Sequence, residues 1–320
     1  MRDSTPPLDQ KGPDVTLGSR LLIRVRSALG LGSDIPLTVE GLSEVYRAWC
    51  SRIPFDNIRK MIELSAGGPL GGLDPADFFE HWLEHGTGGT CWPSSNALYT
   101  LLRSIGFEAR RVGGSMYDLG AINHGTVKVH LDGQDWLTDT CMLTHRPLPV
   151  NSELFINDSK EAAVEVEPVD GSHTIWYDFA PSPVYVPCRL RFDRADAAMY
   201  EERYEVFSRQ QSPFNTRLYY RAGGPDGVSL ILGNVRFRRT HGDLEVQEFS
   251  RDGLCDYMRE SGISSDILDR WIALGGLDMS FDPANILPAP EVTGVRPSLR
   301  PAVSSDGRLP VPTFRGPIQK

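Results

Sequence analysis

The residues with the clearest chemical potential stand in the stretch Gly88-Gly-Thr-Cys91-Trp-Pro-Ser-Ser95. Apolar residues recur at helical spacing over residues 97–105 and a glycine then ends the pattern, which predicts a helix that begins at Cys91. The unpaired N–H groups and the positive dipole end of a helix start favour a thiolate, the nucleophilic form of cysteine. Ser94 and Ser95 are expected to hydrogen-bond the free amides of that turn. Cys91 is thus a candidate nucleophile; the alternative is a small buried apolar residue.

A hairpin further along the chain can supply a base and a carboxylate. Asp132-Gly133 separates two β-type runs, which is typical of a two-residue hairpin turn. In that register Thr126 faces Asp139, and His124 lies on the same face one diagonal step away, at roughly 7–8 Å. Acyl transfer through a thioester needs such a His to move a proton and a carboxylate to fix its tautomer. Singly, each is better explained as an ordinary strand residue, but together Cys91, His124 and Asp139 predict a catalytic triad.

Composition limits the classes of function. A chain of 320 residues with 40% hydrophobic and 23% charged residues has the make-up of a soluble globular protein of two or three units. The formal charge of -9 argues against a nucleic-acid surface. No apolar run is long enough to cross a bilayer, and the first residues lack the apolar core of a signal peptide. We therefore expect a cytoplasmic protein without nucleic-acid or membrane partners.

Cysteine spacing gives no indication of a disulfide framework or a metal site. The five cysteines are widely separated and include no C-x-x-C pair. His81 and His85 share one helix face, a spacing compatible with a metal, but no third ligand stands nearby, so solvent-facing histidines are expected.

The elements that must position the triad follow a simple order. Helical patterns begin near Thr16, after a capping Thr38, and at Asp74-Pro75. After residue 106 the pattern becomes β-type, with a break expected at Gly113-Gly114. The rest of the chain predicts strands at 163–166, 174–179 and 184–192, a polar helix within 193–208, a β-meander over 218–249, and closing helices at 252–258 and 265–274.

Several motifs, in order, resemble the arylamine N-acetyltransferase family. They are Arg52-Ile-Pro-Phe-Asp-Asn57, Gly88-Gly-Thr-Cys91, Ser104-Ile-Gly-Phe107, His124 through Leu131-Asp-Gly133 to Trp136-Leu-Thr-Asp139, Ser212-Pro-Phe-Asn215 and Gly224-Pro-Asp-Gly-Val228. The resemblance covers roughly Leu17 to Leu277, and the joint occurrence of these motifs is specific.

The resemblance implies an α+β fold with a cysteine-proteinase-like core. It consists of an N-terminal helical bundle, a central antiparallel β-barrel and a C-terminal α/β lid. On this chain we expect a flexible arm at 1–15, the bundle at 16–106 ending in the helix of Cys91, the barrel with His124 and Asp139 at 107–200, the lid at 201–282, and a proline-rich tail at 283–320.

The resemblance also implies a reaction. Cys91 would take an acyl group, typically acetyl, from acetyl-coenzyme A or another acyl thioester as co-substrate, with no bound cofactor. The acyl-enzyme would then pass the group to an arylamine or another small-molecule amine, with ping-pong kinetics. Three alternatives are open: a natural-product amide synthase fed by an acyl carrier protein, a hydrolase or transglutaminase-like enzyme, and a catalytically silent binding module.

The chain departs from the family pattern at the residues that shape a pocket. Thr87, Pro93 and Ser95 stand where the family usually has other side chains, and Thr140-Cys-Met-Leu143 replaces a glycine-phenylalanine-glycine turn. Side chains in place of glycines restrict the approach of a ligand to the backbone. Cys141, expected on a strand, is interpreted as pocket lining rather than a second nucleophile, and packing explains Trp92 as well as an acceptor contact does. The candidate substrate contacts are Trp92, Gly120, Thr140, Cys141, Met142 and Thr216.

Overall fold

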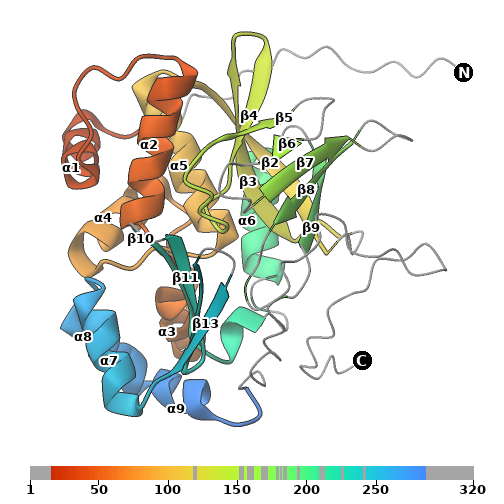
Figure 1. Ribbon diagram of the computed structural model, residues 1–320. Helices are drawn as coiled ribbons and strands as arrows, with labels where there is room; N and C mark the ends of the chain where they lie inside the picture. The colour runs from red at the N-terminus through yellow and green to blue at the C-terminus, as the bar shows by residue number, and fades with distance from the viewer. Residues whose placement is uncertain are drawn as a thin grey trace, which may run out of the picture.

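A computed structural model describes residues 16–117, 121–150, 155–156, 162–166, 172–177, 180, 182, 186–192, 195–207, 209, 213–224, 227–240 and 243–285 (Figure 1). The expected arm at 1–15 and residues 286–320 of the expected tail lie outside the described residues, as does Gly120. Within the described residues, no helix has both the length and the apolar character that crossing a membrane requires.

Four helices form the bundle at the upper left of Figure 1. They are α1 (Ser19–Leu29), α2 (Val39–Arg52), α4 (Pro75–His85) and α5 (Cys91–Ile105). The expected caps are confirmed, because Thr38 accepts a hydrogen bond from the amide of Gly41 and Asp74 accepts one from the amide of Asp77. Gly106 ends α5 with a φ of 117°, a backbone conformation that favours glycine. Aromatic side chains fill the bundle, with Trp49 stacked on Phe78.

The central layer is an eight-stranded antiparallel sheet, ordered β5-β4-β3-β2-β9-β8-β7-β6. Its strands are β2 (Glu108–Met116), β3 (His124–Leu131), β4 (Gln134–Thr138), β5 (Leu148–Val150), β6 (Phe155–Ile156), β7 (Ala162–Val166), β8 (His173–Tyr177) and β9 (Val186–Phe192). Strand β5 at one end also contacts β7 near the other, so the sheet curls into a nearly closed barrel. The strands expected at 163–166, 174–179 and 184–192 are confirmed over their described parts, whereas residues 178–179 and 184–185 lie outside the described residues.

Two local expectations about the barrel have different outcomes. The hairpin register is confirmed, since Leu131 pairs with Gln134 and Val127 with Thr138. The break expected at Gly113-Gly114 does not end a strand, because both glycines lie inside β2, but the pairing of β2 with β9 shifts register between them. A Cβ on Gly114 would lie 2.8 Å from the sulfur of Cys188, so glycine is needed there for close packing between β2 and β9.

The C-terminal layer is a five-stranded antiparallel sheet ordered β1-β10-β11-β12-β13. Its strands are β1 (Phe55–Asp56), β10 (Tyr219–Gly224), β11 (Gly227–Leu232), β12 (Val235–Thr240) and β13 (Asp243–Glu248). Helices α7 (Arg251–Glu260), α8 (Ser265–Ala273) and α9 (Gly276–Phe281) lie at the bottom of Figure 1. The predicted meander and the two predicted closing helices are confirmed, and α9 is a third helix that was not predicted.

Residues 54–66 tie the first third of the chain to this C-terminal layer. Strand β1 pairs with β10, and α3 (Ile58–Ala66), which the sequence pattern missed, packs its Ile58 and Met61 into one core with Trp271 of α8. A short amphipathic helix between a proline and a glycine-rich loop has too few turns to be recognised by periodicity. Whether the predicted ranges of bundle, barrel and lid are independent folding units stays a prediction.

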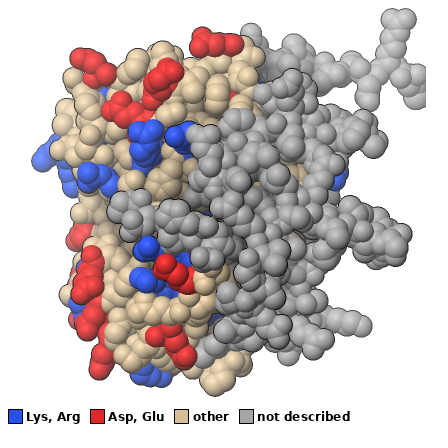
Figure 2. Space-filling model, in the orientation of Figure 1, with Lys and Arg blue, Asp and Glu red and all other residues tan. Residues whose placement is uncertain are grey.

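Short helical segments connect the barrel to the last sheet. The polar helix expected within 193–208 is α6 (Ala197–Glu202), continued by a π-helical turn, η1 (Arg203–Phe207), and η2 (Pro213–Asn215) precedes β10. Figure 2 shows acidic and basic side chains interspersed over the described face of the molecule.

Candidate active site

Cys91 is the first residue of α5 and is buried, with 7% of its surface exposed. This placement at a helix start is the predicted one. The expected role of the neighbouring serines is wrong: Ser94 donates its hydroxyl hydrogen to the carbonyl of Gly89, and Ser95 donates to the carbonyl of Gly125. Both hydroxyls thus bind acceptors, which leaves the first amides of α5 without serine caps. Helix geometry gives those amides no partner within α5.

Asp56 of β1 fixes the turn that carries Cys91. Its carboxylate accepts hydrogen bonds from the amide of Gly88 at 2.6 Å and from that of Ile58 at 3.0 Å. Burial raises the pKa of Asp56 to about 7, although these two amides act to lower it. A Cβ on Gly88 would lie 1.8 Å from the carbonyl oxygen of Pro54, so only glycine fits this approach. The motifs around residues 52–57 and 88–91 are therefore parts of one structure.

The hairpin brings His124 and Asp139 together as the register predicts. His124 begins β3, Asp139 directly follows β4, and the Nε2 atom of His124 lies 2.6 Å from Oδ2 of Asp139. Both side chains are buried. The Nδ1 atom of His124 is the ring nitrogen that remains for the sulfur atoms.

Two tyrosines that were not predicted as site residues hold Asp139 in place. Tyr177 of β8 donates its hydroxyl to Oδ2 of Asp139 at 3.1 Å. Tyr46 of α2 donates to the carbonyl oxygen of Asp139 at 2.7 Å and accepts from its amide at 3.1 Å. The amides of Cys141 and Met142 donate to Oδ1. The contacts of the two tyrosines join distant parts of the sequence, so no local pattern indicates them.

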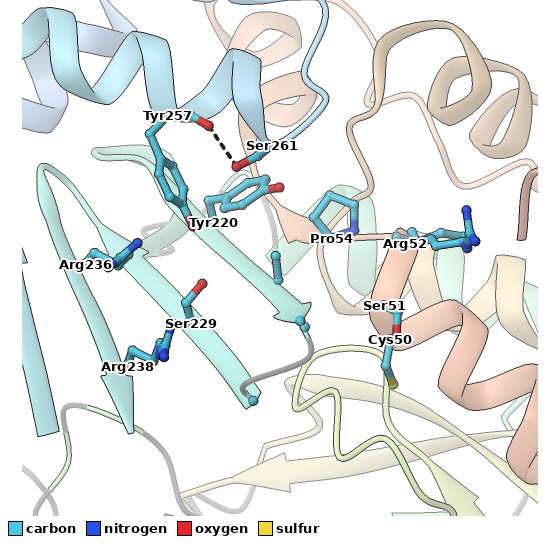
Figure 3. Close-up of a pocket in the computed structure, with 15 residues that line it drawn as sticks. Cys50, Ser51, Arg52, Pro54, Tyr220, Ser229, Arg236, Arg238, Tyr257 and Ser261 are labelled. Carbon is cyan, nitrogen blue, oxygen red and sulfur yellow. Dashed lines mark hydrogen bonds between the residues drawn. The ribbon is translucent and has the colours of Figure 1, made fainter. Parts of the chain in front are cut away.

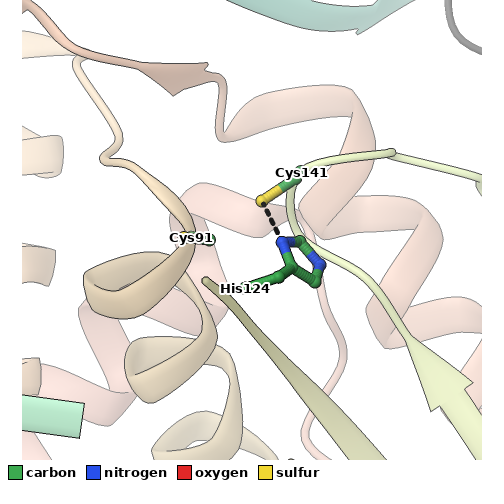
Figure 4. A group of neighbouring side chains, drawn as sticks. All are labelled: Cys91, His124 and Cys141. Carbon is green, nitrogen blue, oxygen red and sulfur yellow. Dashed lines mark hydrogen bonds between the residues drawn. The ribbon is translucent and has the colours of Figure 1, made fainter. Parts of the chain in front are cut away.

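Cys141 lies beside the other two reactive groups. It is in a turn after Asp139, not on the expected strand, and its sulfur lies 3.9 Å from Nδ1 of His124 (Figure 4). The Cys91 sulfur, His124 and the Cys141 sulfur all have ligand-type atoms within 4.8 Å of one another. The turn forms because the Oδ1 atom of Asp139 accepts hydrogen bonds from two backbone amides of the turn, those of Cys141 and Met142.

The electrostatics of this cluster favour a Cys91 thiolate. A hydrogen bond donated by Cys141 holds the pKa of Cys91 well below its usual range; burial opposes this, and His124 contributes further lowering. Burial acts to lower the pKa of His124, but the charge and hydrogen bond of Asp139, together with Cys91, raise it to about 10. Burial raises the pKa of Cys141, and so does its hydrogen bond to Cys91. The favoured arrangement is a thiolate beside an imidazolium, with Cys141 as the neutral donor.

The remaining candidate contact residues differ in burial and in their partners. Trp92 is buried and packs edge-on against Tyr200 at 5.0 Å, so the structure places it in the core beneath α5. Thr140 is buried, with its hydroxyl 3.1 Å from that of Ser95. Met142 is buried, and its sulfur accepts a hydrogen bond from Arg221. Thr216 is exposed, in the segment between η2 and β10.

A buried lysine on α3 also interacts with the nucleophile. Lys60 is 3% exposed, and its amino group lies 5.7 Å from the centre of the Phe214 ring. Burial lowers its pKa to about 8, and the charge of Cys91 acts to raise it. No local sequence pattern indicates Lys60 as a site residue, because α3 itself was not predicted.

A hollow of about 260 Å³ lies between the end of α2 and the strands β10 to β12 (Figure 3). Arg236 and Arg238 of β12 line it, with Arg236 over the ring of Tyr257 at 5.5 Å and Arg238 3.6 Å from Glu245. This hollow is lined by none of the three triad residues.

The two histidines with metal-compatible spacing have other partners. His81 Nδ1 lies 2.9 Å from the hydroxyl of Thr87, and burial lowers the pKa of His81 to about 3. His85 Nδ1 lies 3.0 Å from the hydroxyl of Ser264. The expectation that both face solvent is wrong, since each is partly buried and joins α4 to a neighbouring segment.

A helix that delivers a cysteine to a His and an Asp on a β-barrel defines the class of proteins with a cysteine-proteinase-like core. A family model described as N-acetyltransferase matches residues 38–257. The chain therefore belongs to the N-acetyltransferase family, and the resemblance to arylamine N-acetyltransferases is confirmed.

Curated relatives are distant. The chain is 23% identical to human arylamine N-acetyltransferase 1 over 232 residues, which cover 64% of this chain and 77% of that protein. It is 27% identical to Proansamycin X synthase of Amycolatopsis mediterranei over 117 residues, which cover 35% of this chain and 44% of that protein. The latter match thus spans less than half the length of the relative.

Solved structures show the same fold. The arylamine N-acetyltransferase of Mycobacterium marinum aligns with a TM-score of 0.69 at 15% identity, covering 81% of this chain and 100% of that one. The same enzyme in complex with CoA aligns with a TM-score of 0.68 at 16% identity, covering 80% and 98%. The enzyme of Mycobacterium abscessus gives 0.67 at 18% identity, covering 80% and 94%.

Proposed function

We propose that this protein is an N-acyltransferase that moves an acyl group, acetyl being the first candidate, from a coenzyme A thioester through a Cys91 acyl-enzyme to an arylamine or another small-molecule amine. The observation that carries the proposal is the buried chain of contacts from Asp139 through His124 to the Cys91 sulfur at a helix start. Family membership supports acyl transfer as the reaction class.

The proposed reaction has two halves. The Cys91 thiolate attacks the thioester carbonyl, the bond to the leaving sulfur breaks, and the imidazolium of His124 gives that sulfur its proton. An amine then attacks the acyl-cysteine, His124 takes the proton of the amine, and the amide leaves as the Cys91 thiolate re-forms. Asp139 holds the imidazole in one orientation and stabilises its charged form throughout. No prosthetic group takes part in this scheme.

The backbone amides of Cys91 and Trp92 in the first turn of α5 are the proposed oxyanion donors, since Pro93 has no N–H and the amide of Ser94 donates to the carbonyl of Thr90. Amides at a helix start point outward along the axis without intrahelical partners, so they can meet the negative oxygen of a tetrahedral intermediate. The serine hydroxyls of this turn bind carbonyl groups instead, which keeps them from competing for those amides.

A natural-product amide synthase is the second candidate. Two observations favour it: the similarity to a protein named Proansamycin X synthase, and the buried side chains of Cys141 and Met142 in the turn after Asp139. In that case the donor is a longer acyl thioester or an acyl carrier protein. A hydrolase or transglutaminase-like activity on an amide uses the same three residues and ranks third.

The test is intact-mass measurement after incubation with single acyl donors. The protein is mixed separately with acetyl-coenzyme A, a longer acyl-coenzyme A and an acylated carrier protein. Cys91→Ala is the variant without the nucleophile. Cys255→Ala is the matched control, because Cys255 is also a buried free cysteine but lies in the core under α7.

Each outcome has a defined meaning. One acetyl adduct from acetyl-coenzyme A, kept in Cys255→Ala and lost in Cys91→Ala, supports the leading proposal, and release of the adduct by an arylamine completes it. An adduct only from the longer thioester or the carrier protein supports the amide synthase. No adduct from any donor overturns both.

A further inference from the structure

We propose that Cys91, His124 and Cys141 form a three-ligand site for a zinc ion, which occupies the active centre in place of the acyl group. Two sulfur atoms and one ring nitrogen lie within 4.8 Å of one another there. Their residues come from a helix start, a strand and a turn (Figure 4). Thiolate and imidazole are the ligands that Zn²⁺ prefers.

The distances are close to those of a tetrahedral zinc site. With Zn–S near 2.3 Å and Zn–N near 2.0 Å, neighbouring ligand atoms in such a site lie roughly 3.5–3.8 Å apart. The Cys141 sulfur is 3.9 Å from Nδ1 of His124, and the three ligand atoms all lie within 4.8 Å of one another. Side-chain adjustments of less than about 1 Å therefore close the site around an ion.

The surroundings of His124 also match a zinc ligand. Zinc-binding histidines usually donate their second ring N–H to a carboxylate, which fixes the tautomer and the ring orientation. Here Nε2 of His124 lies 2.6 Å from Asp139, which is itself held by Tyr177. Nδ1 is thus the nitrogen directed to the two sulfurs, as a Cys₂His site requires.

Zinc binding and acyl transfer exclude one another at this centre. The ion takes the Cys91 sulfur and the Nδ1 atom of His124, the two atoms that the proposed reaction uses, and the thiols lose their protons on binding. Three protein ligands leave the fourth position to water. Zinc inhibition therefore rests on the proposed function, whereas zinc binding does not.

Binding is measured first and without any substrate. Reduced protein is titrated with Zn²⁺ in a calorimeter, and separately with Co²⁺ while thiolate-to-cobalt charge-transfer absorption is recorded. We expect one ion per chain, and at least about a 100-fold weaker affinity in Cys141→Ala, since loss of a ligand exceeds the 10–100-fold effect typical of outer contacts. Cys255→Ala is the matched control and should bind as the unchanged protein does.

The result that overturns the site is equal Zn²⁺ affinity in the unchanged protein and in Cys141→Ala, or Co²⁺ binding without thiolate absorption. Cys141→Ser, which keeps the size of the side chain, provides a second variant, and circular dichroism establishes that each variant is folded. Equal affinity in folded Cys141→Ser likewise overturns the site.

The effect of Zn²⁺ on acyl transfer is then measured as the amount of Cys91 acyl adduct seen by intact mass. One equivalent of Zn²⁺ should prevent the Cys91 acyl adduct, and a chelator should restore it. An adduct that forms unhindered with zinc bound overturns the placement of the ion at Cys91. If no adduct forms even without zinc, the proposed function fails while the calorimetric result stands on its own.

Discussion

The sulfur of Cys91 is surrounded by groups that favour its anionic form. Cys141 donates a hydrogen bond to it, and His124 adds a positive charge. Because the thiolate is the reactive species, the pKa of Cys91 can be read from the pH dependence of its alkylation.

We expect the rate at which iodoacetamide alkylates Cys91 to fall only at a pH below that at which an ordinary cysteine, with a pKa of about 8.5, loses reactivity, because the pKa of Cys91 is lowered. In Cys141→Ala the lost hydrogen bond raises the pKa of Cys91, so the fall in rate should move to higher pH. Peptide-level mass spectrometry in a buffer with chelator measures the rate at Cys91 alone. Superimposable pH profiles for the two proteins would contradict the role of Cys141.

The burial of Lys60 predicts that the stability of the folded protein depends on pH. Burial lowers its pKa in the folded protein to about 8, below the 10.5 of a free lysine, so its charge destabilises the fold at lower pH. Between these two values the unfolded chain binds more protons, and stability rises with pH. Lys60→Met should therefore be more stable than the unchanged protein at pH 7, on the order of 1–3 kcal/mol, with a smaller difference at pH 10.

Urea unfolding at the two pH values measures the effect of Lys60. Lys128→Met is the matched control: Lys128 is equally buried, but its amino group lies 3.8 Å from Asp135. Removing that ion pair should not stabilise the protein. If Lys60→Met is less stable than the unchanged protein at pH 7, the charge of Lys60 does not destabilise the fold and the prediction is wrong.

Among the elements, the two-residue strand β1 has an effect far beyond its length. The side chain of Asp56 accepts a hydrogen bond from the amide of Gly88 and so sets the position of α5 and of Cys91. The backbone of β1 pairs with β10. The turn at the nucleophile is thus positioned by a segment that belongs to the C-terminal sheet.

Asp56→Asn should destabilise the protein by about 1–3 kcal/mol and reduce formation of the Cys91 adduct. An amide group offers one oxygen to the two backbone N–H donors, so one buried donor loses its acceptor. Chemical unfolding and intact mass measure the two effects. Asp132→Asn in the hairpin turn is the control, since Asn tolerates the φ of 51° there and should change neither quantity. Equal stability of Asp56→Asn would disprove the role of this carboxylate.

Across the whole molecule, Asn57 joins the first third of the chain to the segment before β10. Its amide nitrogen donates to the carbonyls of Phe214 and Arg217, each at 2.7 Å, and its oxygen accepts the amide of Tyr219 at 2.8 Å. These bonds fasten the segment between β1 and α3 to the chain that leads from η2 into β10.

Asn57→Ala should cost on the order of 3 kcal/mol, because several buried backbone groups lose their partners at once. Tryptophan fluorescence and circular dichroism, followed through urea unfolding, measure the loss and any separation into two transitions. Asn285→Ala, which removes one hydrogen bond to Met279, is the control for a local loss. Comparable stability of the two variants would contradict a joining role for Asn57.

The sequence by itself determined the features that depend on neighbours along the chain. Three features follow from local hydrogen bonding and period-two alternation: the start of α5 at Cys91, the caps Thr38 and Asp74, and the hairpin register that brings His124 within reach of Asp139. Together with the motif resemblance, these features were sufficient to predict the fold class and the family.

Only the tertiary structure decided what burial and long-range contacts impose. It placed β1 and α3 in the C-terminal layer, turned Cys141 toward His124, set Tyr177 on Asp139, and enclosed Lys60. None of these follows from periodicity, because each depends on which surfaces pack together after the helices and strands have formed. The physical reason is that local hydrogen bonds act within a few residues, whereas packing joins residues of any separation in sequence.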